Sequence, residues 1–90
     1  MIVQKTLTIK NELGLHARSA AMIVRAVEGS RSTVSLERDG ITVDARSLLD
    51  ILTLACPKDS RIVVRADGAD AREVVESIEK LVESGFGEAA

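Results

Sequence analysis

The chain of 90 residues has almost no aromatic side chains: Phe86 is its single aromatic residue, and Trp and Tyr are absent. A platform for stacking nucleic-acid bases or sugar rings is therefore excluded. The hydrophobic residues, 46% of the chain, must build a core from Val, Ile, Leu and Ala, which suits thin layers of helix on sheet. Because this length supports one hydrophobic core and not two, we expect a single domain over residues 1–90.

Cysteine and histidine are equally scarce, with one of each, Cys56 and His16. An internal disulfide is impossible, and these two ligands alone cannot close a zinc site. We expect neither a metal nor a cofactor, and we expect Cys56 to pack rather than react. A single cysteine also suits a reducing cytoplasm.

The charges are small in sum and mixed in sign, with a net charge of −2. The concentrated basic face of a nucleic-acid-binding protein is missing. No apolar run reaches the roughly 18–20 residues of a membrane span, and the first five residues lack the pattern of a signal peptide. We therefore expect a cytoplasmic protein that binds neither nucleic acid nor membrane.

Hydrophobic periodicity divides the first half of the chain. Residues 3–9 alternate as in a β-strand, although Lys5 interrupts the apolar face. A loop over residues 11–15 follows, in which Gly14 is available for an unusual backbone angle. Residues 17–27 carry one apolar stripe at helical spacing, and Gly29 stands where a left-handed C-terminal cap is favoured.

The middle of the chain predicts a β-hairpin and a short helix. Two alternating runs flank Asp39-Gly40, a strong signal for a two-residue hairpin turn. Ser47 is placed to cap a short helix that we expect Pro57 to end. Residues 62–64 then form the next strand.

The last segment predicts a longer helix. Asp70 and Glu73 have the spacing of a capping box, and residues 74–82 continue an apolar stripe for three turns. Gly85 is expected to cap this helix, with Phe86 folding back on the last turn. The order β-α-β-β-α-β-α predicts an α+β fold in which helices pack on one face of an antiparallel sheet. A ferredoxin-like domain has nearly the same order, so the order alone assigns no function.

The informative stretch is Gly14-Leu15-His16-Ala17-Arg18. His16 lies at the junction of loop and helix, where unpaired backbone N–H groups make a natural phosphate seat. Arg18 adds a permanent cation. The helix end and Arg18 both oppose protonation of the imidazole, and the neutral ring is the nucleophile that accepts a phosphoryl group. The alternative is a histidine that only caps the helix, with Arg18 as an ordinary solvated charge.

This stretch, with Ala20-Ala21 after it, closely resembles the active-site signature of the HPr family, the histidine-containing phosphocarriers of the bacterial phosphoenolpyruvate-dependent sugar phosphotransferase system. The resemblance covers essentially the whole chain, through Ala45-Arg46-Ser47-Leu48, Gly68-Ala69-Asp70 and the closing residues 84–88. It implies an open-faced β-sandwich, with four antiparallel strands and three helices on one face.

The resemblance also implies a mechanism. Phosphorylated enzyme I would donate to Nδ1 of His16, and His16 would donate to an enzyme IIA domain. Arg18 would assist the phosphoryl group, and the backbone amides of Ala17 and Arg18 would receive it. Such a protein is a monomeric covalent carrier that needs another protein to catalyse each step, rather than a stand-alone enzyme.

Ser47 matches the serine that a dedicated ATP-dependent kinase phosphorylates in many family members. A phosphate there, beside an apolar docking patch, would disfavour association with partners. The alternative is that Ser47 only caps its helix.

The short helix is apolar nearly all round, and an exposed apolar patch usually marks a partner site. In the family it flanks the histidine and forms a docking surface shared by enzyme I and enzyme IIA. We expect one of its three docking leucines to belong to the core, and the two arginines of the set have an alternative as plain solvated bases. The docking residues expected from the resemblance are Ala17, Ala20, Ala21, Arg25, Arg46, Leu48, Leu49 and Leu52.

Three departures from the family pattern stand out. Ser19 replaces the usual proline, which predicts a looser helix start. Asp50 and Glu28 occupy positions that are often basic, which bears on affinity for an acidic partner. Ala55 and Asp59 replace loop positions that are often glycine, which predicts a modified turn.

The sequence is compatible with three functions. The first is a phosphocarrier in sugar uptake. The second is a regulatory relative in a nitrogen-related or kinase-control branch that drives no transporter; retention of His16 argues against a purely serine-regulated one. The third, a small-molecule-binding regulatory domain with ferredoxin-like topology, would bind its ligand without phosphotransfer and leaves the pairing of His16 with Arg18 unexplained.

Overall fold

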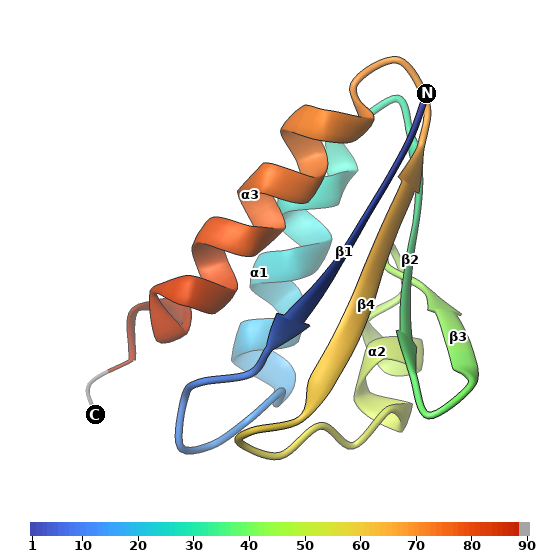
Figure 1. Ribbon diagram of the computed structural model, residues 1–90. Helices are drawn as coiled ribbons and strands as arrows, with labels where there is room; N and C mark the ends of the chain where they lie inside the picture. Colours follow the sequence, from blue (N-terminus) through green and yellow to red (C-terminus); the bar gives the residue numbers. More distant parts are fainter. Residues whose placement is uncertain (89–90) are drawn as a thin grey trace.

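The computed structural model describes residues 1–88 and has the predicted order of elements (Figure 1). A short 3₁₀ turn, η1, follows the last helix. The elements are β1 (Ile2–Thr8), α1 (Ala17–Glu28), β2 (Thr33–Arg38), β3 (Ile41–Asp44), α2 (Leu48–Thr53), β4 (Arg61–Asp67), α3 (Ala71–Glu83) and η1 (Gly85–Gly87).

The four strands form one antiparallel sheet in the order β1-β4-β2-β3, and the helices lie on one of its faces (Figure 1). The α+β, open-faced prediction is confirmed. The β2–β3 hairpin turns at Asp39 and Gly40, whose φ angles of 50° and 81° are both left-handed, as its two-residue turn requires. Within residues 1–88, no helix is long and apolar enough to cross a membrane.

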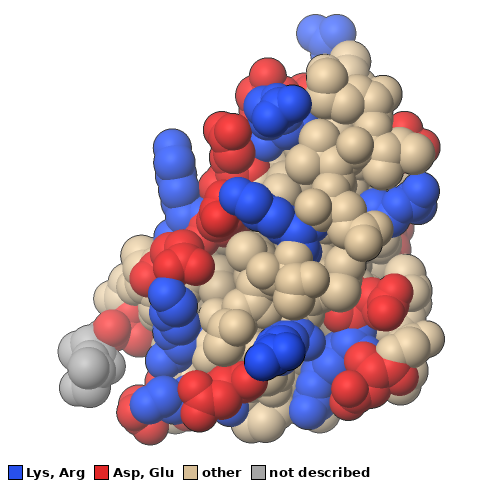
Figure 2. All heavy atoms as spheres, in the orientation of Figure 1, with Lys and Arg blue, Asp and Glu red and all other residues tan. Residues whose placement is uncertain are grey.

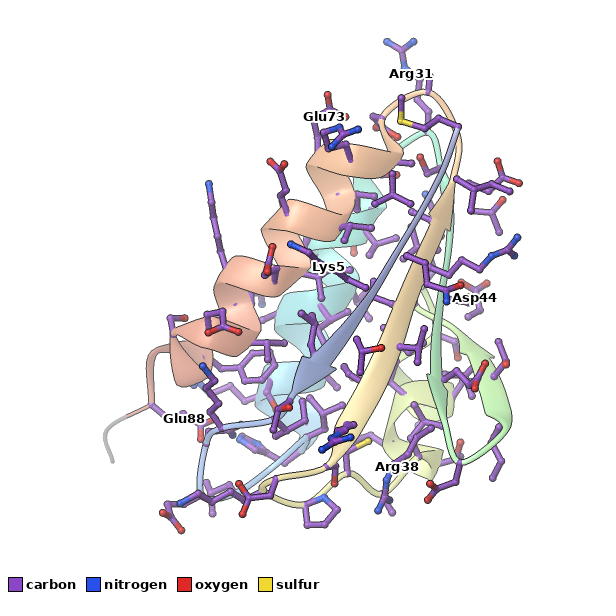
Figure 3. The ribbon with its side chains drawn as sticks, viewed as in Figure 1. Lys5, Arg31, Arg38, Asp44, Glu73 and Glu88 are labelled. Atoms are coloured by element: carbon purple, nitrogen blue, oxygen red, sulfur yellow. The ribbon has the colours of Figure 1, made fainter. Side chains whose placement is uncertain are left out.

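The core lies between the sheet and the helices and is almost entirely aliphatic. Strand β4 illustrates the pattern, because Ile62, Val64 and Ala66 are fully buried. The position of the strand explains why Lys5 can interrupt the apolar face of β1. Strand β1 is at the edge of the sheet, and Lys5 reaches the carboxylate of Glu79 on α3 at 2.8 Å (Figure 3).

The end of α1 differs from the prediction. Gly29 has φ −82° and ψ −1°, so the expected left-handed cap is wrong. The backbone N–H of Gly29 donates to the carbonyl oxygen of Val27. The guanidinium of Arg46 donates to the same oxygen and to the carbonyl oxygens of Ser30 and Ser32 in the following loop, at 2.8–3.2 Å. One of these carbonyls, that of Val27, belongs to the last turn of α1, so a cation distant in the sequence lies at the negative end of the helix.

The end of α2 also differs, because the helix stops at Thr53 rather than at Pro57. Ala55 has φ 47°, which no α-helix allows, and Arg38 donates to the carbonyl oxygens of Leu54 and Ala55 at 3.0 and 2.8 Å (Figure 3). Ala55 and Asp59 replace loop positions that are often glycine in the family. Both keep a left-handed backbone, with φ angles of 47° and 72°.

Asp70 does not form the predicted capping box with Glu73, and that prediction is wrong. Its carboxylate turns toward the loop before β2, where it accepts hydrogen bonds from the Arg31 backbone N–H and from the hydroxyls of Ser30 and Ser32. These donors lower the pKa of Asp70, with the Ser32 hydroxyl as the largest cause and the Arg31 N–H next. Asp70 therefore ties α3 to the β2 side of the fold.

The cap after α3 is confirmed. Gly85 has φ 62° in the position after the helix, and Phe86 is fully buried. The turn brings the last described residues within reach of the start of α1, where Oε2 of Glu88 lies 2.6 Å from Nε2 of His16.

Candidate functional site

Three distant segments meet at one end of the molecule: the loop over residues 9–15, the first turn of α1 and residues 85–88 after α3 (Figure 1). Figure 3 shows Glu88, from the last of these, beside the start of α1. His16 lies where they meet, with 32% of its side chain exposed.

His16 is the N-cap of α1, as predicted. Its backbone is extended, with φ −128° and ψ −177°, and its Nδ1 accepts a long hydrogen bond of 3.4 Å from the backbone N–H of Arg18. This nitrogen therefore lies over the positive end of the helix, where an anion is stabilised.

Ser19 completes the cap from the third helical position. Its fully buried hydroxyl accepts from the His16 backbone N–H at 3.0 Å, which makes a reciprocal capping box with the histidine side chain. Where the family usually has proline, this chain anchors the helix start through a hydrogen bond rather than through a ring.

Gly14 has the unusual backbone angle expected of it, with φ 66°, and also a steric requirement. A Cβ at this position would lie 2.2 Å from the carbonyl oxygen of Cys56, which accepts from the Leu15 N–H at 2.8 Å. Only glycine lets the two loops approach so closely. Cys56 is buried, and burial raises the pKa of its thiol, which fits a packing role.

Glu88 is the site residue that sequence reasoning missed. One carboxylate oxygen, Oε2, lies 2.6 Å from Nε2 of His16, and the other, Oε1, accepts from Nδ2 of Asn11 at 2.9 Å. Hydrogen bonds from Asn11 and then from His16 are the main causes that lower the pKa of Glu88. The resemblance includes Glu88 among the closing residues 84–88, but it did not place this carboxylate beside a histidine 72 residues away in the sequence.

Arg18 also faces the C-terminal segment. Its Nη1 lies 3.4 Å from the carbonyl oxygen of Phe86 and 3.7 Å from Oε2 of Glu88. The side chain of Arg18 is 59% exposed.

The residues expected to form a docking face differ in how exposed they are. Ala20 is fully buried and offers no surface to a partner, so its assignment to that face is wrong. Leu48 and Leu49 are exposed by 36% and 75%, whereas Leu52 packs against the core. Of the other expected docking residues, Ala17, Arg25 and Arg46 are exposed and Ala21 is half-buried. The guanidinium of Arg46 is also bonded to the Val27 carbonyl oxygen at the end of α1.

Ser47 caps α2, as predicted. Its Oγ accepts from the backbone N–H of Asp50 at 3.3 Å, and the residue is half-exposed next to Leu48.

On the face seen in Figure 2, acidic and basic side chains are interspersed rather than segregated.

The comparisons with known proteins agree with this geometry. The sequence model of one family, described as the PTS HPr component phosphorylation site, matches residues 3–84. The chain belongs to the HPr family. Similar HPr-family sequences include the phosphocarrier protein HPr of Cupriavidus necator, which is 34% identical over 87 residues that cover 97% of this chain and 98% of that protein.

A solved HPr structure extends the likeness to the whole fold. HPr-C-His from Thermoanaerobacter tengcongensis has a TM-score of 0.93 and 34% identity, and the match covers 98% of this chain and 99% of that one. The multiphosphoryl transfer protein of Haemophilus influenzae is 37% identical over 86 residues, which cover 92% of this chain and 17% of that protein.

Proposed function

We propose that this HPr-family chain carries a phosphoryl group on Nδ1 of His16, received from phosphorylated enzyme I and passed to an enzyme IIA domain in sugar uptake. The observation that carries the proposal is the position of Nδ1. It faces the backbone N–H of Arg18 at the start of α1 and is not covered by Glu88, which lies at the opposite nitrogen.

The chemistry follows from that position. The lone pair of Nδ1 attacks phosphorus, a phosphorus–nitrogen bond forms, and the bond from phosphorus to the donor group of enzyme I breaks. The new negative charge lies at the positive end of α1, within reach of the N–H groups of Ala17 and Arg18. The second transfer reverses these steps toward enzyme IIA.

The same proposal includes a single carrier domain and a docking face formed by the starts of α1 and α2. Leu48 and Leu49 give this face its exposed apolar surface, and α2 packs against α1. Phosphorylation of Ser47 by a serine kinase would place about two negative charges beside the two leucines, which would weaken docking. A regulatory relative that drives no transporter remains the second candidate, and the half-exposed Ser47 hydroxyl favours it.

Intact-mass analysis tests the carrier role. The chain is incubated with phosphoenolpyruvate, magnesium and purified enzyme I, beside His16→Ala as the control. A single acid-labile phosphate on the wild type, absent from the variant, supports the proposal. An unphosphorylated wild type, with enzyme I active on its own HPr, would overturn it. Transfer onward to enzyme IIA then separates the sugar carrier from the regulatory relative.

A further inference from the structure

The imidazole of His16 is held between two groups whose hydrogen-bonding roles are fixed. The backbone N–H of Arg18 only donates, so the Nδ1 atom that it approaches must be unprotonated. The ionised carboxylate of Glu88 only accepts, so the Nε2 atom 2.6 Å away must carry the proton. Both neighbours therefore select the same neutral tautomer, the one that leaves a lone pair on Nδ1.

The carboxylate is itself held in place. Asn11, which is 6% exposed, donates from Nδ2 both to Oε1 of Glu88 and to the carbonyl oxygen of Gly14, at 2.9 and 2.8 Å. The buried ring of Phe86 anchors the chain two residues earlier. The side chain of Glu88 is only 14% exposed, and both of its carboxylate oxygens have hydrogen-bond partners.

We propose that Glu88 is a positioning residue for phosphotransfer, which holds the His16 ring through Nε2 and so keeps Nδ1 unprotonated and turned toward α1. After transfer the proton stays on Nε2, and the phosphorylated ring is formally cationic at that side. The Glu88 carboxylate stabilises this charge. This inference rests on the proposed function, because it concerns the same histidine.

A test without enzyme I uses nuclear magnetic resonance and a small chemical donor. At a pH of about 8, above the ordinary range of histidine titration, the Nε2–H proton of His16 is expected to be visible in the wild type. It should be lost by exchange in Glu88→Ala and restored in Glu88→Gln, whose amide oxygen accepts the same bond. Glu83→Ala, which removes an exposed carboxylate paired with Lys10, is the matched control and should behave as wild type.

Phosphoramidate then reports which ring nitrogen is open. Its phosphorus–nitrogen bond breaks, phosphorus bonds to the unprotonated imidazole nitrogen, and the reagent's own protonated amine leaves as ammonia, so the ring keeps the proton on its other nitrogen. In the wild type the carboxylate covers Nε2 and repels the anionic reagent, so the product is confined to Nδ1. Glu88→Ala should also yield the Nε2 product, which phosphorus and nitrogen spectra distinguish. An identical product ratio and an equally visible Nε2–H proton in Glu88→Ala and wild type would overturn the inference.

Kinetics with enzyme I complete the test. Loss of this charge-assisted hydrogen bond is expected to lower kcat/KM for phosphorylation about tenfold in Glu88→Ala, with most of the rate restored in Glu88→Gln. A slower rate without any spectroscopic change would mean that Glu88 serves docking instead, and would refute the positioning role. If enzyme I fails to phosphorylate the wild type, the carrier proposal fails, while the spectra still decide the tautomer.

Discussion

Replacement of Ser19 by alanine tests the reasoning about the helix start most directly. The Ser19 hydroxyl is fully buried and accepts from the backbone N–H of His16 at 3.0 Å. Alanine removes the acceptor and leaves that donor without its side-chain partner. Loss of an N-terminal capping interaction costs about 1 kcal/mol, and a donor left unsatisfied by truncation costs about 1–3 kcal/mol. We therefore expect the free energy of unfolding to fall by about 1–2 kcal/mol.

The assay is urea and thermal denaturation followed by far-ultraviolet circular dichroism, since the chain has no Trp or Tyr to report by fluorescence. For a domain of this size each kcal/mol lowers Tm by roughly 4–8 °C. Ser77→Ala is the matched control, because that exposed hydroxyl bonds back to the carbonyl oxygen of Glu73 within α3 and alanine favours helix there. Equal stabilities of the two variants would refute the account of the cap.

Two further predictions concern the loops. Ala55→Gly should raise the free energy of unfolding by about 0.5–1 kcal/mol in urea denaturation, because relief of the left-handed strain at φ 47° exceeds the extra freedom of glycine in the unfolded chain; a loss of stability would contradict the strain. Asp70→Asn should be less stable than wild type at neutral pH. Because the pKa of Asp70 is lowered, chiefly by the Ser32 hydroxyl, the carboxylate stabilises the fold above its ordinary pKa of about 3.9, and this is lost as pH falls further. The gap between the two denaturation curves should therefore close in acid, and a gap independent of pH would refute the assignment.

Local patterns predicted the elements well because each depends on neighbours in the chain. The hairpin at Asp39-Gly40, the cap at Ser47 and the N-cap at His16 all use side chains within a few residues. Three errors, at the ends of α1 and α2 and at Asp70, fall where a side chain bonds to backbone far away in the sequence. The fourth, at Ala20, has another origin, because this residue is fully buried. Arg46 and Arg38 cap the ends of α1 and α2 across the fold, and no local pattern encodes such a reach.

In the candidate site, too, the contacts between neighbours in the sequence were predictable and the long-range contact was not. The helix-facing nitrogen of His16 was predictable, since the loop, the cap and Arg18 are adjacent in sequence. The other nitrogen was not, because its partner, Glu88, arrives only after the chain has crossed the whole fold. Its arrival depends on the left-handed Gly85 and the buried Phe86. By burying Phe86, the apolar core thus places the Glu88 carboxylate beside Nε2 of His16, a contact that no local sequence pattern encodes.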